Sequence, residues 1–373
     1  MNRDVAARIR GRARRRGPDR NPSATGTPYD PVVNLTAEDA GTRRRSVRLE
    51  PSLDALLAGV THRAEWKTSD SLSGGRFERV QIDGVPLVLK RVCVDDDWIM
   101  RGTGDLECYQ VTLHVSHLLD HLPAAIDDAL IACAPFTSPQ GHRGAALLLR
   151  DVSASLVPPG SDTVSLAAHR AFLAHMAEMH AAYWGFRDSV GLIPLLHHYT
   201  ILTPTMAALE LARGGTDPVP RAVRQGWTGL DRTHPEDTRI LRALAADPAP
   251  LGRVLGSKAQ TLIHGDWKFG NLGADGASTI LLDWDRCGQA SPLMDLAWYL
   301  AVNCDRLPET KEAAIDAYRA ALDAHGIDTA PWWDAHLRVA LAGAFLQLAW
   351  SKTGDDVEYA WWSQQLRAAL PLL

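Results

Sequence analysis

The sequence predicts an α+β fold with two lobes, a small antiparallel sheet with one helix followed by a larger helical lobe that contains a β-hairpin. Three observations predict it. Three β-rich runs separated by glycine-containing turns lie between residues 63 and 92, and helical patterns dominate after residue 165. A short hairpin pattern at residues 271–283 interrupts these helices. The chain of 373 residues is longer than one hydrophobic core usually supports.

The composition narrows the class of protein. Hydrophobic residues make up 46% and charged residues 22%, which is ordinary for a globular domain. A net charge of −5 argues against a general nucleic-acid binder, and no apolar run reaches the roughly 18 residues that a membrane span needs. Five cysteines without a C-x-x-C pair favour reduced thiols and no zinc site. We expect a cytoplasmic protein that binds neither nucleic acid nor membrane, either a monomer or a homodimer.

Residues 1–46 are rich in Arg, Pro, Gly, Ser and Thr and include two runs of three arginines, at 14–16 and 43–45. Such a segment buries too little apolar surface to offset the entropy of ordering it. We expect a disordered basic tail, for which contact with nucleic acid or a membrane surface is the alternative.

Residues 47–150 are expected to form the first lobe. Asp83-Gly84 suits a tight hairpin turn, and a glycine turn at Gly74-Gly75 precedes it. The patterns predict a short helix at Pro51–Leu57, strands at Arg63–Ser69, Phe77–Ile82, Val85–Val92 and Ala145–Leu149, and one longer helix at Asp105–Leu122.

Residues 151–373 are expected to form the helical lobe. Apolar residues at helical spacing, with glycine or proline at the ends, mark its helices. These are predicted at Ser165–Trp184, Thr205–Arg213, Pro235–Ala246, Pro292–Val302, Lys311–His325, Pro331–Ala349 and Asp356–Leu370.

The hairpin pattern carries the most chemistry. If Asn271–Gly273 pairs with Thr279–Leu282 across the Asp275-Gly276 turn, Asn271 and Asp283 meet at the open end of the hairpin. An amide oxygen and a carboxylate suit a hard cation such as Mg²⁺. Asp266, just upstream, then remains free to act as a base.

Lys90 is unusual because it lies in the middle of a β-rich run, VPLVLKRV. A surface lysine on a half-exposed strand is the simpler interpretation. The order of the elements along the chain favours a second interpretation, a phosphate-binding lysine. In it, the turn at Gly74 and Gly75 would bring backbone N–H groups near phosphates, and Lys90 would hold the phosphates while pairing with Glu107 on the next helix. The turn lacks the full G-x-G-x-x-G spacing.

Residues 264–271 read H-G-D-x-K-x-x-N, the spacing of the catalytic loop of protein-kinase-like phosphotransferases with glycine in place of arginine. Together with LLDWDRCGQASPLMDLAW, VLKRV and LAHMAEMHAAYWG, this loop resembles the aminoglycoside phosphotransferase and choline kinase family of small-molecule kinases. The resemblance covers about residues 50–350 and implies a bilobal protein-kinase-like fold.

The resemblance implies that Asp266 accepts the proton of an attacking hydroxyl and that Asn271 and Asp283 bind Mg²⁺. Lys90 becomes the phosphate anchor, paired with Glu107. The donor is ATP, with GTP as the alternative.

Two further roles complete this assignment. The resemblance implies that main-chain groups of Arg150 and Val152 hold the adenine. Lys268, two residues past the base, is expected to stabilise the charge of the transferring phosphoryl group, although many relatives lack a lysine there.

Neighbouring residues receive structural or mixed interpretations. His264 is expected to tie the loop to nearby backbone, and Asp295 to cap its helix or bind the loop. Asp285 is either a second metal-site carboxylate or a loop cap. Gly265 removes the arginine that pairs with an activation-loop phosphate in regulated protein kinases, and the short run from Asp283 to Asp295 leaves no platform for a peptide. Both features indicate a small alcohol as acceptor.

The acceptor is expected to bind between the hairpin and the helices of residues 192–258 and 305–373. The latter segment is acidic and rich in tryptophan, which suits a cationic aminoglycoside, a sugar or a base. A solvated acidic face with tryptophans in the core is the alternative. The residues concerned are Asp305, Glu309, Glu312, Asp316, Asp334, Asp355, Asp356, Glu358, Trp332, Trp333, Trp361 and Trp362.

Two other functions stay open at this point. A pseudokinase or nucleotide-sensing module would keep the same nucleotide-binding residues without transfer. A metallohydrolase would use His264, Asp266, Asp283 and Asp285 as a metal cluster, but it leaves Lys90 without a role.

Overall fold

The computed structural model describes residues 47–66 and 73–373, all of which belong to one compact unit. The basic tail expected at residues 1–46 lies outside the described residues. No helix in the described ranges combines the length and the apolar character that crossing a membrane requires. All five cysteines are free thiols.

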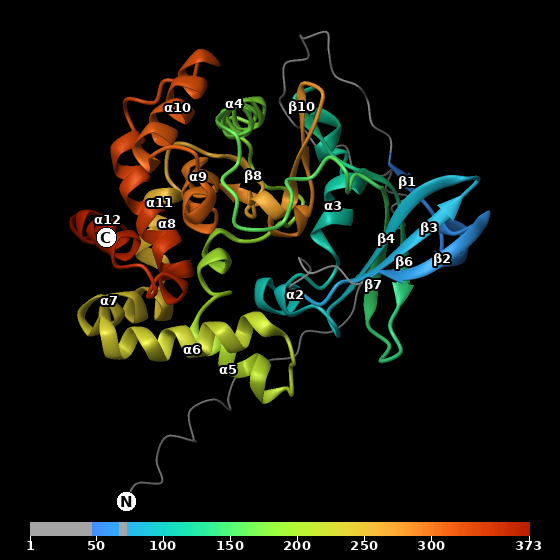
Figure 1. Cartoon of the computed structure of the whole chain (residues 1–373), viewed down its shortest axis with the longest axis horizontal. Coiled ribbons are helices and arrows are strands. Elements are labelled where there is room, and N and C mark those ends of the chain that lie inside the picture. The colour runs from blue at the N-terminus through green and yellow to red at the C-terminus, as the bar shows by residue number, and fades with distance from the viewer. Residues whose placement is uncertain (1–46, 67–72) are drawn as a thin grey trace, which may run out of the picture. The chain divides into compact units, whose positions relative to one another are not determined.

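The first part of the chain forms a six-stranded sheet (Figure 1), in the order β1-β6-β7-β4-β3-β2. All neighbouring strands are antiparallel except the short β1, which runs parallel to β6. The strands are β1 (Arg48–Leu49), β2 (Val60–Trp66), β3 (Arg76–Ile82), β4 (Val85–Cys93), β6 (Leu130–Thr137) and β7 (Arg143–Arg150). The expected strands are confirmed within the described residues, and residues 67–69 of the strand expected at Arg63–Ser69 lie outside them. Strands β1 and β6 were not predicted.

Short helices accompany this sheet instead of the single helix expected at Asp105–Leu122. They are α1 (Leu53–Leu56), α2 (Trp98–Thr103), α3 (Tyr109–Val115) and the 3₁₀ turn η1 (Leu118–His121). The expected helix is broken because Cys108 and His117 have positive φ values of 65° and 58°, a conformation that a helix cannot accommodate.

Residues after 150 are mainly helical, as expected, and they surround the hairpin. The helices are α4 (Leu166–Ala182), α5 (Pro204–Ala212), α6 (Pro218–Thr233), α7 (Pro235–Ala246), α8 (Ala249–Leu255), α9 (Leu293–Val302), α10 (Lys311–Ala324), α11 (Trp333–Leu348) and α12 (Asp356–Ala369), with 3₁₀ turns η2 (Leu195–Tyr199), η3 (Phe269–Asn271), η4 (Trp284–Arg286), η5 (Cys304–Arg306), η6 (Ala349–Ser351) and η7 (Leu370–Leu372). The sequence did not predict α6.

Two small sheets sit among these helices and hold residues 261–290, which include the H-G-D-x-K-x-x-N loop. The hairpin of β9 (Leu272–Asp275) and β10 (Ser278–Leu281) gains a third strand, β5 (Ile126–Asp127), which runs parallel to β10. Strand β8 (Thr261–Ile263) pairs with β11 (Gly288–Ala290). A mainly antiparallel sheet that carries Lys90, followed by a mainly helical part with this hairpin, confirms the α+β class and the order of parts expected from the sequence.

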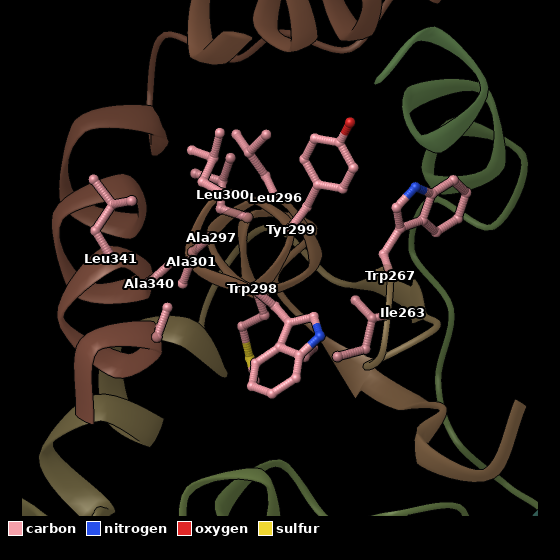
Figure 2. Packing of buried hydrophobic residues seen from close by; sticks show 14 of the residues in the cluster. Ile263, Trp267, Leu296, Ala297, Trp298, Tyr299, Leu300, Ala301, Ala340 and Leu341 are labelled. Carbon is pink, nitrogen blue, oxygen red and sulfur yellow. The ribbon is translucent and has the colours of Figure 1, made fainter. Parts of the chain in front are cut away.

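The core of the helical part is built around α9, whose side chains from Leu293 to Ala301 are all buried. Figure 2 shows α9 residues such as Ala301 facing Ala340 and Leu341 of α11. A helix that is apolar all round belongs in the interior. Because α9 follows directly after β11, its first turn lies beneath the catalytic loop.

Candidate active site

The hairpin forms in the expected register. Leu272 pairs with Leu281 and Asp275 with Ser278, so the two turn residues are Gly276 and Ala277, one position past the predicted Asp275-Gly276 turn. At the open end, the Leu282 N–H donates to the Asn271 carbonyl at 2.9 Å. Asn271 and Asp283, the residue after Leu282, are therefore brought to the same end of the hairpin.

The first turn of α9 anchors the catalytic loop. The Asp295 carboxylate accepts the N–H groups of His264 and Gly265, each at 2.7 Å. Gly265 has φ +78°, and a Cβ there would lie 2.1 Å from the Arg286 carbonyl oxygen. A residue with a side chain does not fit at this position. Packing therefore requires glycine here, in the place where regulated protein kinases have a phosphate-binding arginine.

His264 is a structural residue, as expected. Its Nε2 donates to the Leu282 carbonyl at 3.0 Å, and its Nδ1 accepts the Asp266 N–H at 3.2 Å. Burial lowers the pKa of His264, so the ring is neutral. Both ring nitrogens are engaged by backbone, which leaves neither for a metal.

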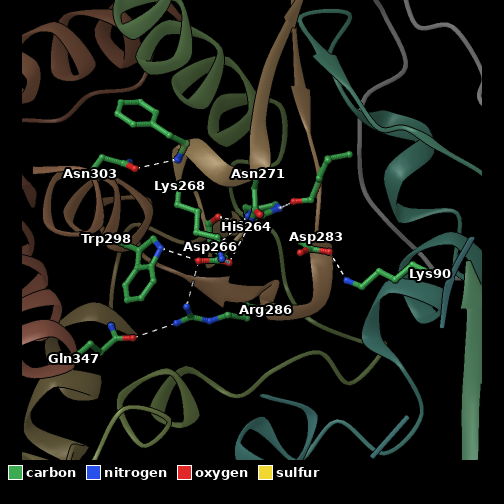
Figure 3. Close-up of polar contacts among 12 residues, drawn as sticks. Lys90, His264, Asp266, Lys268, Asn271, Asp283, Arg286, Trp298, Asn303 and Gln347 are labelled. Atoms are coloured by element: carbon green, nitrogen blue, oxygen red, sulfur yellow. Dashed lines mark hydrogen bonds and ion pairs between the residues drawn. The ribbon is translucent and has the colours of Figure 1, made fainter. Parts of the chain in front are cut away.

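Asp266 is 6% exposed and is surrounded by donors. Its Oδ2 lies 2.7 Å from Lys268 Nζ and 3.0 Å from Asn271 Nδ2, and its Oδ1 accepts Trp298 Nε1 at 3.0 Å (Figure 3). Burial raises the pKa of Asp266, but Lys268 and Arg286 outweigh burial and bring it to about 2. The carboxylate is therefore ionised at any working pH.

Arg286 and Trp298 are site residues that the sequence reasoning missed. The Arg286 guanidinium is buried, with Nη1 3.5 Å from Asp266 Oδ1, Nη2 3.1 Å from Gln347 Oε1, and its carbon 4.4 Å from the Trp298 ring centroid. One signal for Arg286 exists: it is the only basic residue in the motif LLDWDRCGQASPLMDLAW. Trp298 carries no signal beyond helical spacing.

Lys90 forms an ion pair with Asp283 across the sheet and the hairpin (Figure 3). The lysine is buried, and burial lowers its pKa, yet the carboxylates of Asp283 and Asp285 raise that pKa above its ordinary value. Burial raises the pKa of Asp283, but the ion pair with Lys90 outweighs burial and holds that pKa below its ordinary value. Burial and the neighbouring Asp283 charge raise the pKa of Asp285 to about 8.

The described part of the glycine turn lies beside Lys90. Gly74 has φ +105°, and a Cβ there would lie 2.1 Å from the Asp96 carbonyl oxygen. A Cβ on Gly75 would lie 3.5 Å from Lys90 Cε. The end of the turn therefore packs against Lys90 and against the residues just before α2. Residues 67–72 of the turn lie outside the described residues.

The expected pair between Lys90 and Glu107 is not made, and this part of the prediction is wrong. Glu107 is an exposed residue whose carboxylate lies 3.2 Å from Arg143 Nη1. The positive φ of Cys108 turns the chain just before α3, so Glu107 faces outward and Asp105 inward. Asp105 Oδ2 then accepts the Tyr109 N–H at 2.9 Å.

Arg150 and Val152 lie where β7 leaves the sheet. The Arg150 N–H donates to the Ala129 carbonyl and the Val152 carbonyl accepts the Ser155 N–H, both at 2.9 Å. The Arg150 side chain is held by Asp127 at 2.5 Å. This segment is a fixed, extended link between the sheet and the helical part.

The acidic and tryptophan-rich set of the C-terminal helices contributes mainly to packing. Trp332, Trp333 and Trp362 are buried, in agreement with the core alternative. The carboxylates also have partners within the fold: Glu309 binds His169 and Arg170, Glu312 binds Trp361, and Glu358 binds Lys311 and Trp362. Each of these three glutamates therefore has a partner within the chain, and Glu312 is exposed. In the described ranges, no group of three or more His, Cys, Asp or Glu side chains has a geometry that suits a metal ion.

Comparison with known proteins gives a family for the segment that carries this site. Residues 158–332 match the model of the phosphotransferase enzyme family. No curated protein sequence is similar enough to the chain to be matched.

Three solved structures illustrate the likeness. A thermostable mutant of aminoglycoside phosphotransferase APH(4)-Ia, in a ternary complex with ADP and hygromycin B, is 13% identical, with 86% of this chain and 97% of that chain covered and a TM-score of 0.43. Choline kinase LicA from Streptococcus pneumoniae is 10% identical, with 84% and 96% covered and a TM-score of 0.46. The microcompartment-associated aminopropanol kinase is 14% identical, with 83% and 90% covered and a TM-score of 0.45. Likeness at this level carries no argument about function.

The matched segment holds the loop of residues 264–271, the hairpin and α9, whereas the motif VLKRV at residues 88–92 lies outside it. Residues 158–332 are therefore similar to the phosphotransferase enzyme family, in agreement with the resemblance that the sequence motifs carry.

Proposed function

We propose that this protein transfers the γ-phosphoryl group of ATP, in the presence of Mg²⁺, to a hydroxyl group of a small molecule. One observation carries the proposal. A buried, ionised Asp266 lies at 2.7 Å from Lys268, and the same hairpin brings Asp283 into an ion pair with Lys90 of the sheet. A base and two cations around one hairpin end suit phosphoryl transfer, in which catalysis is mostly positioning and charge stabilisation.

The nucleotide would lie between the glycine turn, Lys90 and the link after β7. Gly74 and Gly75 let the backbone approach the phosphates, and Lys90 supplies a cation for them. At the link, the N–H of Arg150 and the carbonyl of Val152 are used within the fold. The Arg150 carbonyl and the Val152 N–H offer an acceptor and a donor in the order that the adenine amino group and ring nitrogen need.

Asn271 and Asp283 fit a Mg²⁺ site by the chemistry of their atoms. The Asn271 amide nitrogen donates to the Asp266 carbonyl and to Asp266 Oδ2, each at 3.0 Å, so the amide oxygen is the atom left for a cation. Asp283 adds a carboxylate, and one or two such ligands are what Mg²⁺ takes beside phosphates. Held by Asn271 and Asp283, the ion would supply positive charge that offsets the charge of the phosphates.

Asp266 would orient the acceptor hydroxyl and take its proton. The hydroxyl oxygen forms a bond to the γ-phosphorus while the bond to the oxygen between the β- and γ-phosphates breaks, and the proton passes to Asp266. With a pKa of about 2, Asp266 is a weak base. Proton transfer therefore comes late, when the hydroxyl has become acidic through bonding to phosphorus. Lys268 would stabilise the charge on the transferring group.

The acceptor would be a small alcohol. The chain from Asp283 to the start of α9 at Leu293 contains only a 3₁₀ turn and the three-residue strand β11, which leaves no surface for an extended peptide. An antibiotic of aminoglycoside or nucleoside type, an amino alcohol and a sugar metabolite are the candidate acceptors. The glutamates bound within the fold weaken the argument for a polycation.

The test is ADP release in a coupled assay with a panel of these alcohols, for the wild-type protein and Asp266→Asn. The proposal expects acceptor-dependent ADP release by the wild type and a loss of about 100-fold or more in the variant. Equal background rates for both proteins with every acceptor would overturn it. Tight ATP binding without any transfer would favour the pseudokinase alternative, which the exposed position of Glu107 makes worth testing.

A further inference from the structure

The two oxygens of the Asp266 carboxylate have different partners. Oδ1 accepts the Trp298 Nε1–H at 3.0 Å and lies 3.5 Å from Arg286 Nη1, and both of these side chains are buried (Figure 3). Oδ2 lies 2.7 Å from Lys268 Nζ and 3.0 Å from Asn271 Nδ2. The Lys268 side chain is 32% exposed. Oδ1 is therefore held from the interior, whereas Oδ2 has a partner that solvent reaches.

Trp298 belongs to a helix that holds the loop of residues 264–271 at several points. Asp295, three residues earlier on α9 and so on the same face, binds the backbone at the start of this loop. Asn303, directly after α9, accepts the Phe269 N–H at 3.0 Å. Because α9 is buried along nearly its whole length, the indole of Trp298 has a fixed position relative to the loop.

The same indole also supports Arg286. The guanidinium carbon lies 4.4 Å from the centroid of the Trp298 ring, which is a cation–π contact. Arg286 Nη2 donates to Gln347 Oε1 at 3.1 Å, so α11 holds the other end of the guanidinium. Trp298 therefore acts on Asp266 Oδ1 in two ways, through its own N–H and through the cation that lies on its ring.

Lys268 is the partner that is free to leave the carboxylate during the reaction. In the proposed function it stabilises the charge on the transferring phosphoryl group, and its stem is flexible. When Nζ moves to that group, a position beside Asp266 Oδ2 opens for the acceptor hydroxyl. Oδ1 keeps both of its buried partners throughout.

We propose that Trp298 is the positioning residue of the base: with Arg286 it anchors Oδ1 of Asp266, so that Oδ2 takes the proton of the acceptor hydroxyl. This inference rests on the proposed function. In the transfer step the acceptor O–H bond breaks and its proton passes to Oδ2. The acceptor oxygen keeps the electron pair of that bond and bonds to the γ-phosphorus, while the bond from phosphorus to the departing ADP oxygen breaks.

The experiment compares two substitutions that remove different parts of the indole. Trp298→Phe keeps more of the buried ring volume but has no N–H. Trp298→His loses the six-membered ring but keeps a donor, because the five-membered rings of the two side chains superpose and histidine Nε2 takes the place of Nε1. The measurement is kcat and KM for ATP from coupled ADP release at saturating acceptor and pH 8, where the histidine is neutral.

The kcat of Trp298→Phe should fall about 30-fold, because a hydrogen bond to a charged group is lost. Trp298→His should be about fivefold or more faster than Trp298→Phe. KM for ATP should stay within about threefold of wild type in both variants, because neither touches Lys90 or the glycine turn. A role in packing alone predicts the opposite order, with phenylalanine the more active because it fills more of the buried space.

A matched control is Trp227→Phe. Trp227 is buried, its Nε1–H donates to the Leu202 carbonyl at 3.1 Å, and the Arg242 guanidinium carbon lies 5.5 Å from its ring centroid. It makes the same two kinds of contact on α6, without contacting the proposed base, so its loss should leave kcat within about threefold of wild type.

Two results would overturn the inference while the proposed function stands: a kcat for Trp298→Phe within about threefold of wild type, or a Trp298→Phe protein faster than Trp298→His. If only one variant folds, Trp298→Phe must lose at least about tenfold, or Trp298→His must stay within about tenfold of wild type, and a value outside its bound overturns the inference. A wild-type protein without acceptor-dependent ADP release overturns both.

Discussion

Replacing Lys268 by methionine removes the cation closest to the proposed base while keeping most of the side-chain volume. In the structure Lys268 Nζ lies 2.7 Å from Asp266 Oδ2. Burial raises the pKa of Asp266, and Lys268 is the largest of the influences that nevertheless bring it to about 2 from an ordinary 3.8. That difference corresponds to about 2.5 kcal/mol in favour of the ionised form.

Two effects are expected from Lys268→Met. The rate constant kcat should fall about 100-fold or more, because a positioned donor facing the transferring group is lost. The pKa of Asp266 should rise toward or above 3.8, since burial is then less opposed. A wild-type kcat/KM profile without an acid limb above about pH 4 should therefore gain one in the variant.

The assay is chromatographic measurement of ADP release at saturating acceptor and at several ATP concentrations, at pH values from about 3 to about 9. Lys258→Met is the control, because Lys258 is an exposed lysine outside the site. A kcat for Lys268→Met within threefold of wild type, with an unchanged pH profile, would refute the role given to this lysine.

Three further predictions concern stability and the loop. The raised pKa of Asp97, about 6 against 3.8, means that the folded state binds this proton more tightly than the unfolded state, so its contribution to stability falls as the pH rises from about 4 to about 6; Asp97→Asn should therefore be more stable at pH 7, by up to about 3 kcal/mol in urea unfolding, and a less stable variant would contradict the burial argument. Arg101→Ala should cost about 3 kcal/mol because it leaves Glu210 buried without its partner, whereas Arg242→Ala, which breaks an exposed pair with Asp231, should cost less than about 1 kcal/mol; equal losses would count against a buried latch. Gly265→Ala should lower both thermal stability and kcat, because its Cβ would lie 2.1 Å from the Arg286 carbonyl, while Gly354→Ala, with open space around it, should change neither; a fully active Gly265→Ala protein would show that the loop can move aside.

The hairpin and its loop were the most predictable part of the molecule. An Asp-Gly turn and two flanking apolar runs define the register locally, so the approach of Asn271 to Asp283 followed from the sequence. The structural roles of His264 and Asp295 followed for the same reason, because their partners lie on the loop itself or at the start of the next helix.

The missed elements have local causes. Strand β6 contains Pro135, which argues against a strand, but its partner on one side, β1, reaches only as far as Cys133, so the proline needs no partner there. Helix α6 contains prolines near its start and two glycines, which obscure its pattern. One of them, Gly226, lies where a Cβ would be 2.3 Å from the Trp350 carbonyl, so packing against another element selects the glycine.

The partners of charged side chains were the least predictable feature. The helical pattern around Glu107 suggests that its side chain points toward the sheet, but the positive φ of Cys108 turns that side chain outward. Arg286 and Trp298 reach Asp266 only because η4 and α9 pack on either side of the loop, a tertiary arrangement that no local spacing encodes. The sequence patterns did not predict α2, which is only six residues long and is capped by Asp97.

The most direct test of the proposed function follows the phosphoryl group itself. The protein is incubated with γ-labelled ATP, Mg²⁺ and the acceptor that gives the fastest ADP release, and the products are separated and identified by mass. The account predicts label on a hydroxyl of the acceptor with wild-type protein and none with Asp266→Asn. Label that appears only in inorganic phosphate, or equally on the acceptor with both proteins, would contradict it.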